Sequence, residues 1–163
     1  MRTLAFLAVI FLILPLLVFA GGQFGLLKGR PPAEPGLREG KLKPPSRTSN
    51  SVSSQAEQWP EGEFASEYAT IEPLRFTQDS ALAMNRLRDV LAGWPGARII
   101  DQSPDYIYVQ FETRWLRFVD DCEFLLDPAA RVIHVRSAAR IGRRDFKVNR
   151  ARVEAIRRRA DLR

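Results

Sequence analysis

The sequence predicts an α+β domain, an antiparallel meander sheet with helices packed on one face, preceded by one N-terminal transmembrane helix. Two observations predict the domain. Alternating apolar and polar residues run through residues 98–137 in stretches separated by short turns, which is typical of antiparallel strands. Segments with helical spacing flank these stretches, giving the order strand, helix, four strands, helix. The 163 residues suffice for one such unit with appendages.

An uncharged apolar run opens the chain. As a helix, residues 3–20 span about 27 Å, close to the roughly 30 Å hydrocarbon core of a bilayer. We therefore expect residues 1–27 to be a transmembrane signal anchor in contact with membrane lipids, with the rest of the chain on the periplasmic side. A secretory signal peptide cleaved after Ala20, which releases a secreted form, is the alternative. Counting basic residues on each side favours a cytoplasmic domain instead.

Proline and serine are frequent in residues 28–62, a composition typical of an extended tether. Its six prolines break helices and remove backbone hydrogen-bond donors. The globular domain is expected over residues 63–163.

The domain is predicted to begin with a short strand over residues 70–75. Thr77 or Asp79 can cap a helix that ends near Ala92, because Gly93 follows and stops it. The side chains expected on the buried face of this helix are Met84, Leu87, Val90 and Leu91.

Four more strands and a last helix complete the predicted domain. Cys122 falls in the apolar phase of its strand and is expected to be an inert core residue. The last helix is predicted over residues 146–160, with an apolar stripe of Phe146, Val153, Ile156 and Ala160. The strands are predicted over residues 98–101, 105–113, 114–126 and 131–137.

The opposite phase of these strands gives a second sheet face that is aromatic and charged. Such a face is solvated, or it is covered by the folded-back tether, or it binds a ligand through aromatic contact area and arginines that hold anions. Its predicted members are Tyr106, Tyr108, Trp115, Arg117, Asp121, Glu123, His134 and Arg136.

Asp120 lies in the apolar phase of its strand, and a buried aspartate needs a partner. One interpretation is a functional carboxylate in a hydrolase-like site, with Asp120 or Asp121 acting together with His134 or Arg136. A bulge here would turn Asp121 inward instead. The other interpretation is an ion pair with one of the arginines that follow, namely Arg136, Arg140, Arg143 and Arg144.

Basic residues concentrate in residues 131–163, which hold 12 Lys and Arg against 3 Asp and Glu, whereas the whole chain has a net charge of +6. Arginines around Asp145, a candidate N-cap, form an arrangement suited to an anion. Arg157, Arg158 and Arg159 fit anionic lipid headgroups, which gives the hypothesis of a scaffold on an anionic lipid surface. Nucleic acid is not expected for a membrane-anchored chain.

One cysteine and one histidine exclude an intramolecular disulfide and a site built from several of either residue. The sequence has no Gly-x-Ser-x-Gly elbow, phosphate-binding P-loop or zinc-ligand spacing. We therefore expect no metal and no cofactor, and binding without catalysis.

Residues 36–42, 49–55, 118–124, 133–142 and 148–154 resemble the DUF1499 family, a domain of unknown function found in bacteria and plants. The resemblance implies no established activity, but it implies that residues 49–55 belong to the domain. The family commonly has Pro-Asn-Cys-Val-Ser where this chain has Ser-Asn-Ser-Val-Ser, so a thiol role at Ser51 is absent here.

The predicted function is an uncharacterised membrane-anchored domain that binds an anionic small ligand or an envelope protein. Asp120, Asp121 and His134 are the weaker, catalytic candidates. The predicted ligand-binding residues are Asn50, Ser53, Ser54, Arg136, Ser137, Arg140, Asn149 and Arg150.

Overall fold

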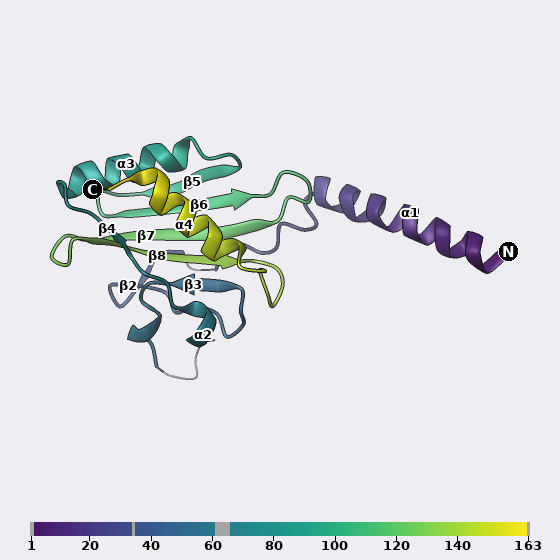
Figure 1. Ribbon diagram of the computed structural model, residues 1–163, viewed down its shortest axis with the longest axis horizontal. Helices are drawn as coiled ribbons and strands as arrows, with labels where there is room; N and C mark the ends of the chain where they lie inside the picture. The colour runs from purple at the N-terminus through teal and green to yellow at the C-terminus, as the bar shows by residue number, and fades with distance from the viewer. Residues whose placement is uncertain (1, 34, 61–65, 163) are drawn as a thin grey trace.

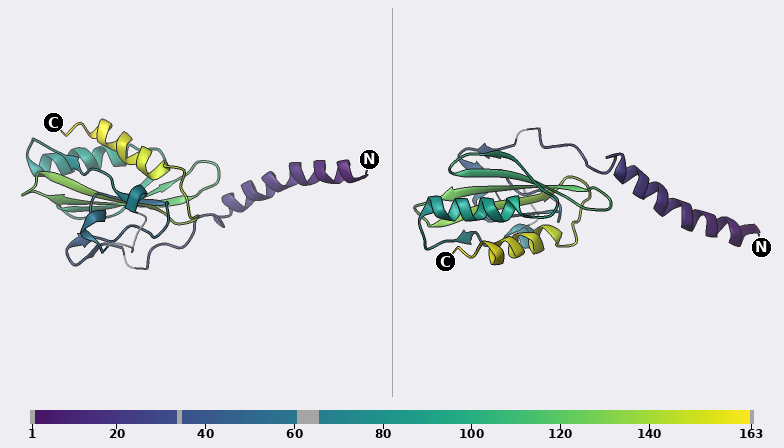
Figure 2. Two further views of the ribbon diagram at one scale, coloured as in Figure 1. Left: turned by 60° about the horizontal axis from the view of Figure 1, so that its bottom comes forward. Right: turned by 90° about the horizontal axis from the view of Figure 1, so that it is seen from above.

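A six-stranded antiparallel sheet lies at the centre of the molecule, as the computed structural model shows for residues 2–33, 35–60 and 66–162. Two long helices cover one face of the sheet, and the segment that follows the first helix of the chain crosses the other face (Figure 1, Figure 2). The α+β prediction is therefore confirmed. The strand order is β3-β8-β7-β6-β5, and β4 also pairs with β8.

The four predicted consecutive strands form the meander β5 (Ala97–Gln102), β6 (Tyr106–Glu112), β7 (Val119–Asp127) and β8 (Val132–Ala139). One boundary was wrong, because the chain turns over residues 114–118 instead of starting β7 there. Arg117 has a left-handed backbone with φ of 57°, which an extended strand does not accommodate. The Thr113 amide donates to the Phe118 carbonyl at 2.9 Å and closes the turn.

Helix α3 (Ser80–Ala92) begins where the sequence predicts, because the Asp79 carboxylate accepts hydrogen bonds from the amides of Ala81 and Leu82. Three of its four predicted core side chains are buried, and Val90 is partly buried against the same core. The buried three are Met84, Leu87 and Leu91.

Helix α4 (Val148–Ala160) begins later than predicted. Phe146 and Lys147 both have left-handed backbones, and the Phe146 side chain is 89% exposed, so it does not belong to the apolar stripe. Asp145 nevertheless caps the helix, since its carboxylate accepts from the amides of Lys147 at 3.1 Å and Asn149 at 2.9 Å. Val153, Ile156 and Ala160 are buried as expected.

The predicted tether is not an extended spacer over its whole length, because residues 35–60, here called the strap, pack on the sheet. Leu42 is fully buried and forms a small second core with Tyr106, Tyr108 and Leu125. Prolines remove hydrogen-bond donors but still allow such apolar contact. The strap contains β1 (Leu37–Arg38), β2 (Lys41–Leu42), β3 (Ser51–Ser53) and the 3-10 helix η1 (Ala56–Gln58).

A short helix and a short strand lead from the strap to α3. These are α2 (Ser66–Ala69) and β4 (Leu74–Arg75). The strand predicted over residues 70–75 is thus limited to its last two residues, because Pro73 has no amide proton to donate to β8.

Helix α1 (Arg2–Gln23) projects away from the domain (Figure 1). Its last turn is fixed to the β6–β7 loop, where the Gln23 side-chain amide donates to the Trp115 carbonyl at 2.8 Å. Among the residues that the structure describes, no helix has the combined length and apolarity of a membrane span. The transmembrane helix expected within residues 1–27 is therefore not supported.

Candidate functional site

Two buried triads of a tyrosine, a carboxylate and an arginine lie between the sheet and the strap. In the first, Glu123 accepts from the Tyr106 hydroxyl at 2.7 Å and from Arg136 at 3.5 Å, and the Gly36 amide of the strap donates to it at 3.0 Å. Arg136 also donates to the Pro44 carbonyl of the strap at 3.1 Å. This triad therefore joins the sheet to the strap, and its arginine is already engaged.

The second triad repeats the first, two residues away on both β6 and β7. The Tyr108 hydroxyl donates to Asp121 at 2.6 Å, and Arg140 holds the same carboxylate through two hydrogen bonds of 2.8 and 2.7 Å. Residues two apart on a strand lie on one face, which explains the repeat. Burial raises the pKa of both tyrosines, and the adjacent carboxylates raise it further, so both hydroxyls stay protonated donors.

A separate polar network lies on the helix-facing side of the sheet. Asp120 pairs with Arg152 of α4 at 2.6 Å, and Arg152 donates to Asn149 at 2.9 Å. The Ser137 hydroxyl also donates to Asn149, at 2.5 Å. Burial raises the pKa of Asp120, with the charges of Asp145 and Asp121 adding to the effect, and Arg152 opposes it only in part.

The predicted partners of Asp120 are therefore wrong. Arg140 pairs with Asp121 and Arg136 with Glu123, both on the opposite face of the sheet. Arg152 belongs to the predicted last helix, but the sequence pattern does not show that this helix packs beside Asp120. The alternative of a bulge that turns Asp121 inward is also wrong, because Asp120 and Asp121 pair with Ala139 and Ala138 in unbroken register.

The predicted ligand-binding residues do not form one pocket. Asn50, Ser137 and Asn149 meet on the helix-facing side, where Asn50 donates to the Gly142 carbonyl at 2.7 Å and Asn149 donates to the Asn50 carbonyl at 3.3 Å. These contacts join residues 49–55, 133–142 and 148–154, the segments that carry the family-like motifs. The ligand-binding role of these residues stays a prediction.

The other members of the predicted set are also engaged within the protein. Arg150 donates to the carbonyls of Tyr68 and Thr70, both at 2.7 Å. The Ser53 hydroxyl accepts from the Gln55 amide at 3.1 Å, and the Ser54 hydroxyl accepts from the Val135 amide at 2.9 Å.

His134 does not reach either aspartate of the hydrolase hypothesis. Ala139 lies opposite Asp120 and is five residues from His134 along β8, a distance of about 16 Å. The imidazole instead contacts the Ser54 hydroxyl at 3.2 Å and the Asp127 carboxylate at 3.8 Å. Burial lowers the pKa of His134 more than Asp127 raises it. Within the described ranges, no cluster of His, Cys, Asp and Glu is arranged to hold a metal ion.

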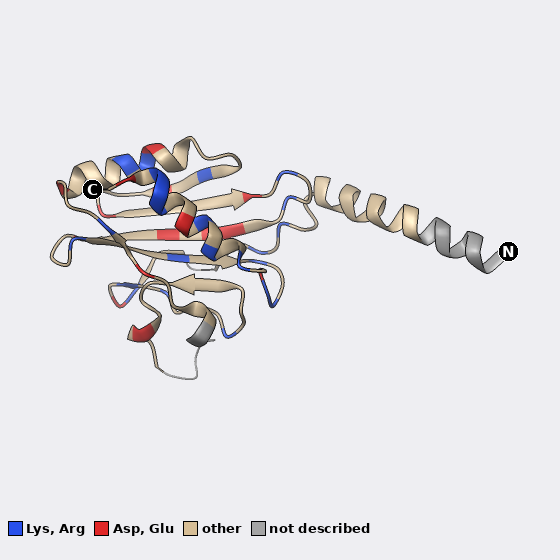
Figure 3. Ribbon diagram, viewed as in Figure 1, with Lys and Arg blue, Asp and Glu red and all other residues tan. Residues whose placement is uncertain are grey.

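A basic pocket of about 480 Å³ lies at the end of the sheet that faces α1. Four cationic side chains and Glu112 line it. Figure 3 colours basic and acidic positions along the ribbon, and both kinds occur in the loops at the end of the sheet next to α1. Glu112 pairs with Lys28 at 2.9 Å and with Arg117 at 2.5 Å. Burial alone would raise the pKa of Glu112, but these two cations hold it below its usual value. The four cations are Lys28, Arg98, Arg117 and Arg140.

The charge in and around this pocket is unbalanced. Its four cations face two carboxylates, Glu112 in the wall and Asp121 behind Arg140, which leaves two positive charges in excess. A larger cavity of about 720 Å³ lies between β4 and the C-terminal half of α4. Its walls contain three arginines and three carboxylates, so they do not select an anion.

The sequence identified Arg140, but it placed Trp115 and Arg117 on a strand face, whereas both lie in the β6–β7 turn, and it missed Lys28 and Arg98. Lys28 reaches the pocket because Gly29, with φ of 67°, approaches so closely that a Cβ there would lie 2.7 Å from the Arg140 Cβ. The glycine was the available signal, but nothing in the local pattern indicates which distant residue it contacts.

Fold and pocket together define a small α+β protein with an antiparallel sheet, a packed strap and a basic pocket beside its N-terminal helix. The chain belongs to the DUF1499 family, described as a protein of unknown function, whose model matches residues 41–159. The match includes Arg98, Arg117 and Arg140, and it begins after Lys28. No curated protein and no solved structure matches the chain.

Proposed function

We propose that this protein is a membrane-associated domain that binds a small anionic ligand, without catalysis, in the basic pocket beside α1. The observation that carries the proposal is the excess of two positive charges around a cavity of about 480 Å³. Ligand pockets in proteins commonly measure about 300–1,000 Å³. Arginines suit such a role because the guanidinium fork donates two parallel hydrogen bonds to a phosphate or carboxylate.

The cations of the pocket differ in how strongly the protein holds them. Asp121 orients Arg140 through two hydrogen bonds, so the Arg140 side chain is held in a fixed position in the pocket wall. Arg98 makes one long hydrogen bond of 3.5 Å, to Gln110, among the contacts described. Lys28 and Arg117 share Glu112, so an anion competes with this carboxylate for both cations.

Membrane association is the second part of the proposal, with the domain on the periplasmic side. It is supported by the absence of charge in residues 3–20 and by the apolar side chains that α1 exposes along its described length, from Phe11 to Phe19. Helix α1 projects away from the domain, which leaves these side chains exposed (Figure 1).

Titration of the full chain in detergent micelles with inorganic phosphate, followed by calorimetry, tests the anion site. We expect saturable binding that weakens about tenfold in Arg98→Gln and in Lys28→Gln, since each removes one charge-assisted contact. Glu112→Gln should bind more tightly, because it removes the competing carboxylate.

The matched control is Arg75→Gln, which removes an exposed arginine outside the pocket and should leave the affinity unchanged. Absence of saturable binding, or equal weakening in the control, would contradict the proposed anion site.

The lipid-scaffold hypothesis based on Arg157, Arg158 and Arg159 is less well supported. Arg157 donates to the Glu72 carbonyl at 2.6 Å, and Arg159 stacks over the Trp94 ring at 4.2 Å. The C-terminal end of α4 also lies at the opposite end of the domain from α1 (Figure 1). Only Arg158 offers a largely uncommitted exposed side chain at this end of the helix among the contacts described.

A further inference from the structure

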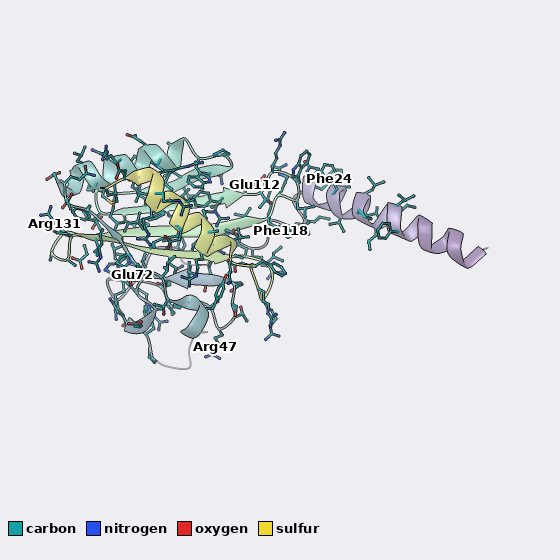
Figure 4. The ribbon with its side chains drawn as sticks, viewed as in Figure 1. Phe24, Arg47, Glu72, Glu112, Phe118 and Arg131 are labelled. Carbon is teal, nitrogen blue, oxygen red and sulfur yellow. The ribbon has the colours of Figure 1, made fainter. Side chains whose placement is uncertain are left out.

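We propose that the α1-side tip, defined as the β6–β7 loop (residues 113–118) together with Phe24 and Leu26, docks into the interfacial layer of an anionic bilayer. Docking there places the basic pocket at the level of the lipid phosphates, which makes lipid headgroups the source of its anion. The inference rests on the proposed membrane association and deepens it. Figure 4 shows Phe24, Glu112 and Phe118 at this end of the molecule, and Arg131 at the far end.

The tip exposes three large apolar side chains close to the base of α1. Phe24 is 85% exposed, Leu26 is 75% exposed and Trp115 is 63% exposed. Single exposed apolar residues are common on protein surfaces, but these three come from two segments that are bonded to each other. Tryptophan is enriched at membrane interfaces because its ring is amphipathic. A lipid interface is the environment that suits this combination.

The loop and the end of α1 form one unit. Besides the bond from Gln23 to the Trp115 carbonyl, Arg117 donates to the Gln23 carbonyl at 3.4 Å. The rings of Phe19 and Trp115 lie 6.4 Å apart. A Cβ at Gly22 would lie 2.7 Å from the Leu116 carbonyl oxygen, so helix and loop are in direct backbone contact. A bilayer that takes up α1 therefore meets the loop at the same depth.

The charges of the tip match an anionic surface. The Arg114 guanidinium lies 5.0 Å from the centre of the exposed Trp115 ring, which puts a cation beside the interfacial aromatic residue. Lys28 and Arg117 lie behind it in the wall of the basic pocket, and the carboxylate beside them, Glu112, is paired with both. Basic residues next to a membrane-associated helix are attracted to anionic lipids.

The test uses the full chain with phosphatidylcholine vesicles that contain phosphatidylglycerol and brominated acyl chains, which quench tryptophan fluorescence on contact. We expect quenching in the native protein and its near-complete loss in Trp115→Phe. The tryptophans left in that variant, Trp59 and Trp94, are buried or packed against the core. Circular dichroism confirms that the variant is folded.

Charge variants test the anionic character of the contact. Arg114→Gln should reduce quenching more strongly as the phosphatidylglycerol fraction rises, whereas Arg158→Gln, an exposed arginine of α4, should match the native protein. An identical loss in both variants would overturn the assignment of the contact to the tip.

Flotation of the vesicles separates the two proposals. A chain that fails to float contradicts the proposed membrane association itself. A chain that floats while Trp115 stays unquenched overturns the docking inference and leaves the association standing. Protection of Trp115 that depends on protein concentration and not on lipid shows a second copy covering the tip, which also overturns it.

Discussion

Two aspartates near the start of α4 show how burial and hydrogen bonding compete at a single residue. Burial raises the pKa of Asp120, although Arg152 lies 2.6 Å away. Burial acts on Asp145 as well, but the Tyr68 hydroxyl and the amides of Asn149 and Lys147 donate to its carboxylate and hold its pKa below the usual value. Similar side chains in neighbouring positions thus contribute to stability with opposite pH dependence.

The two aspartates therefore give opposite slopes of stability against pH. The contribution of Asp120 is complete below the ordinary value of 3.8 and is lost as pH rises through its raised pKa. The contribution of Asp145 is complete above 3.8 and is lost as pH falls through its lowered pKa. Both slopes are measured by urea unfolding of the native protein, Asp120→Asn and Asp145→Asn at pH values from below to above 3.8. Differences from the native protein that change with pH in the same direction would refute this assignment.

At the scale of the element, the sequence predicted what depends on local periodicity. The alternation of apolar and polar residues located the meander. The N-cap residue Asp79 and the apolar stripe around Leu87 located α3. The start of α4 was misplaced because Asp145 caps the helix from three residues before its first turn, through a left-handed Phe146. The β6–β7 turn was missed because its residues continue the strand-like alternation, while the left-handed Arg117 is invisible in the pattern.

Two leucines on α3 test how much the buried face of this helix contributes to the free energy of unfolding. Leu87 is fully buried, whereas Leu82 on the same helix is 50% exposed. Leu87→Ala should lower the free energy of unfolding by about 2–5 kcal/mol, since it removes buried methyl groups and leaves a cavity. Leu82→Ala should change it by less than about 0.5 kcal/mol. Chemical denaturation measures both, and equal losses would mean that α3 is not held by this face.

Two glycines in turns allow the cost of a left-handed backbone to be measured separately from the cost of a steric clash. Gly96 and Gly40 both have left-handed backbones, with φ of 76° and 74°. A Cβ at Gly96 would lie 2.3 Å from the Glu112 carbonyl oxygen, whereas a Cβ at Gly40 would meet nothing within 4 Å. Gly40→Ala should cost about 1–2 kcal/mol from its backbone conformation alone. Gly96→Ala should cost more, because Glu112 must also move, and thermal unfolding compares the two.

At the scale of the whole molecule, the sequence could not assemble the site. The basic pocket joins Lys28, Arg98 and Arg140 from distant parts of the chain, and only the packing of the segment after α1 against the sheet brings them together. Local composition described residues 28–62 as a tether because prolines dominate the pattern, yet one fully buried leucine, Leu42, packs the strap on the sheet. Contacts of this kind depend on topology, which periodicity does not specify.

The single cysteine reports on the stability of the whole fold. Cys122 lies fully buried on β7, between β6 and β8, and burial raises the pKa of its thiol to about 12. Because the thiolate is the nucleophile, the folded protein should not react with iodoacetamide, and labelling should require the central sheet to open.

The labelling rate should therefore follow the free energy of unfolding whenever refolding is faster than the chemistry. A loss of about 2 kcal/mol in Leu87→Ala corresponds to roughly 30-fold faster labelling, since each 1.4 kcal/mol is tenfold. Leu82→Ala, which leaves the core intact, should label at the native rate. Mass spectrometry of the alkylated chain measures these rates. If Leu87→Ala loses stability to urea without faster labelling, α3 detaches while the sheet stays closed around Cys122, and the molecule does not unfold as a single cooperative unit.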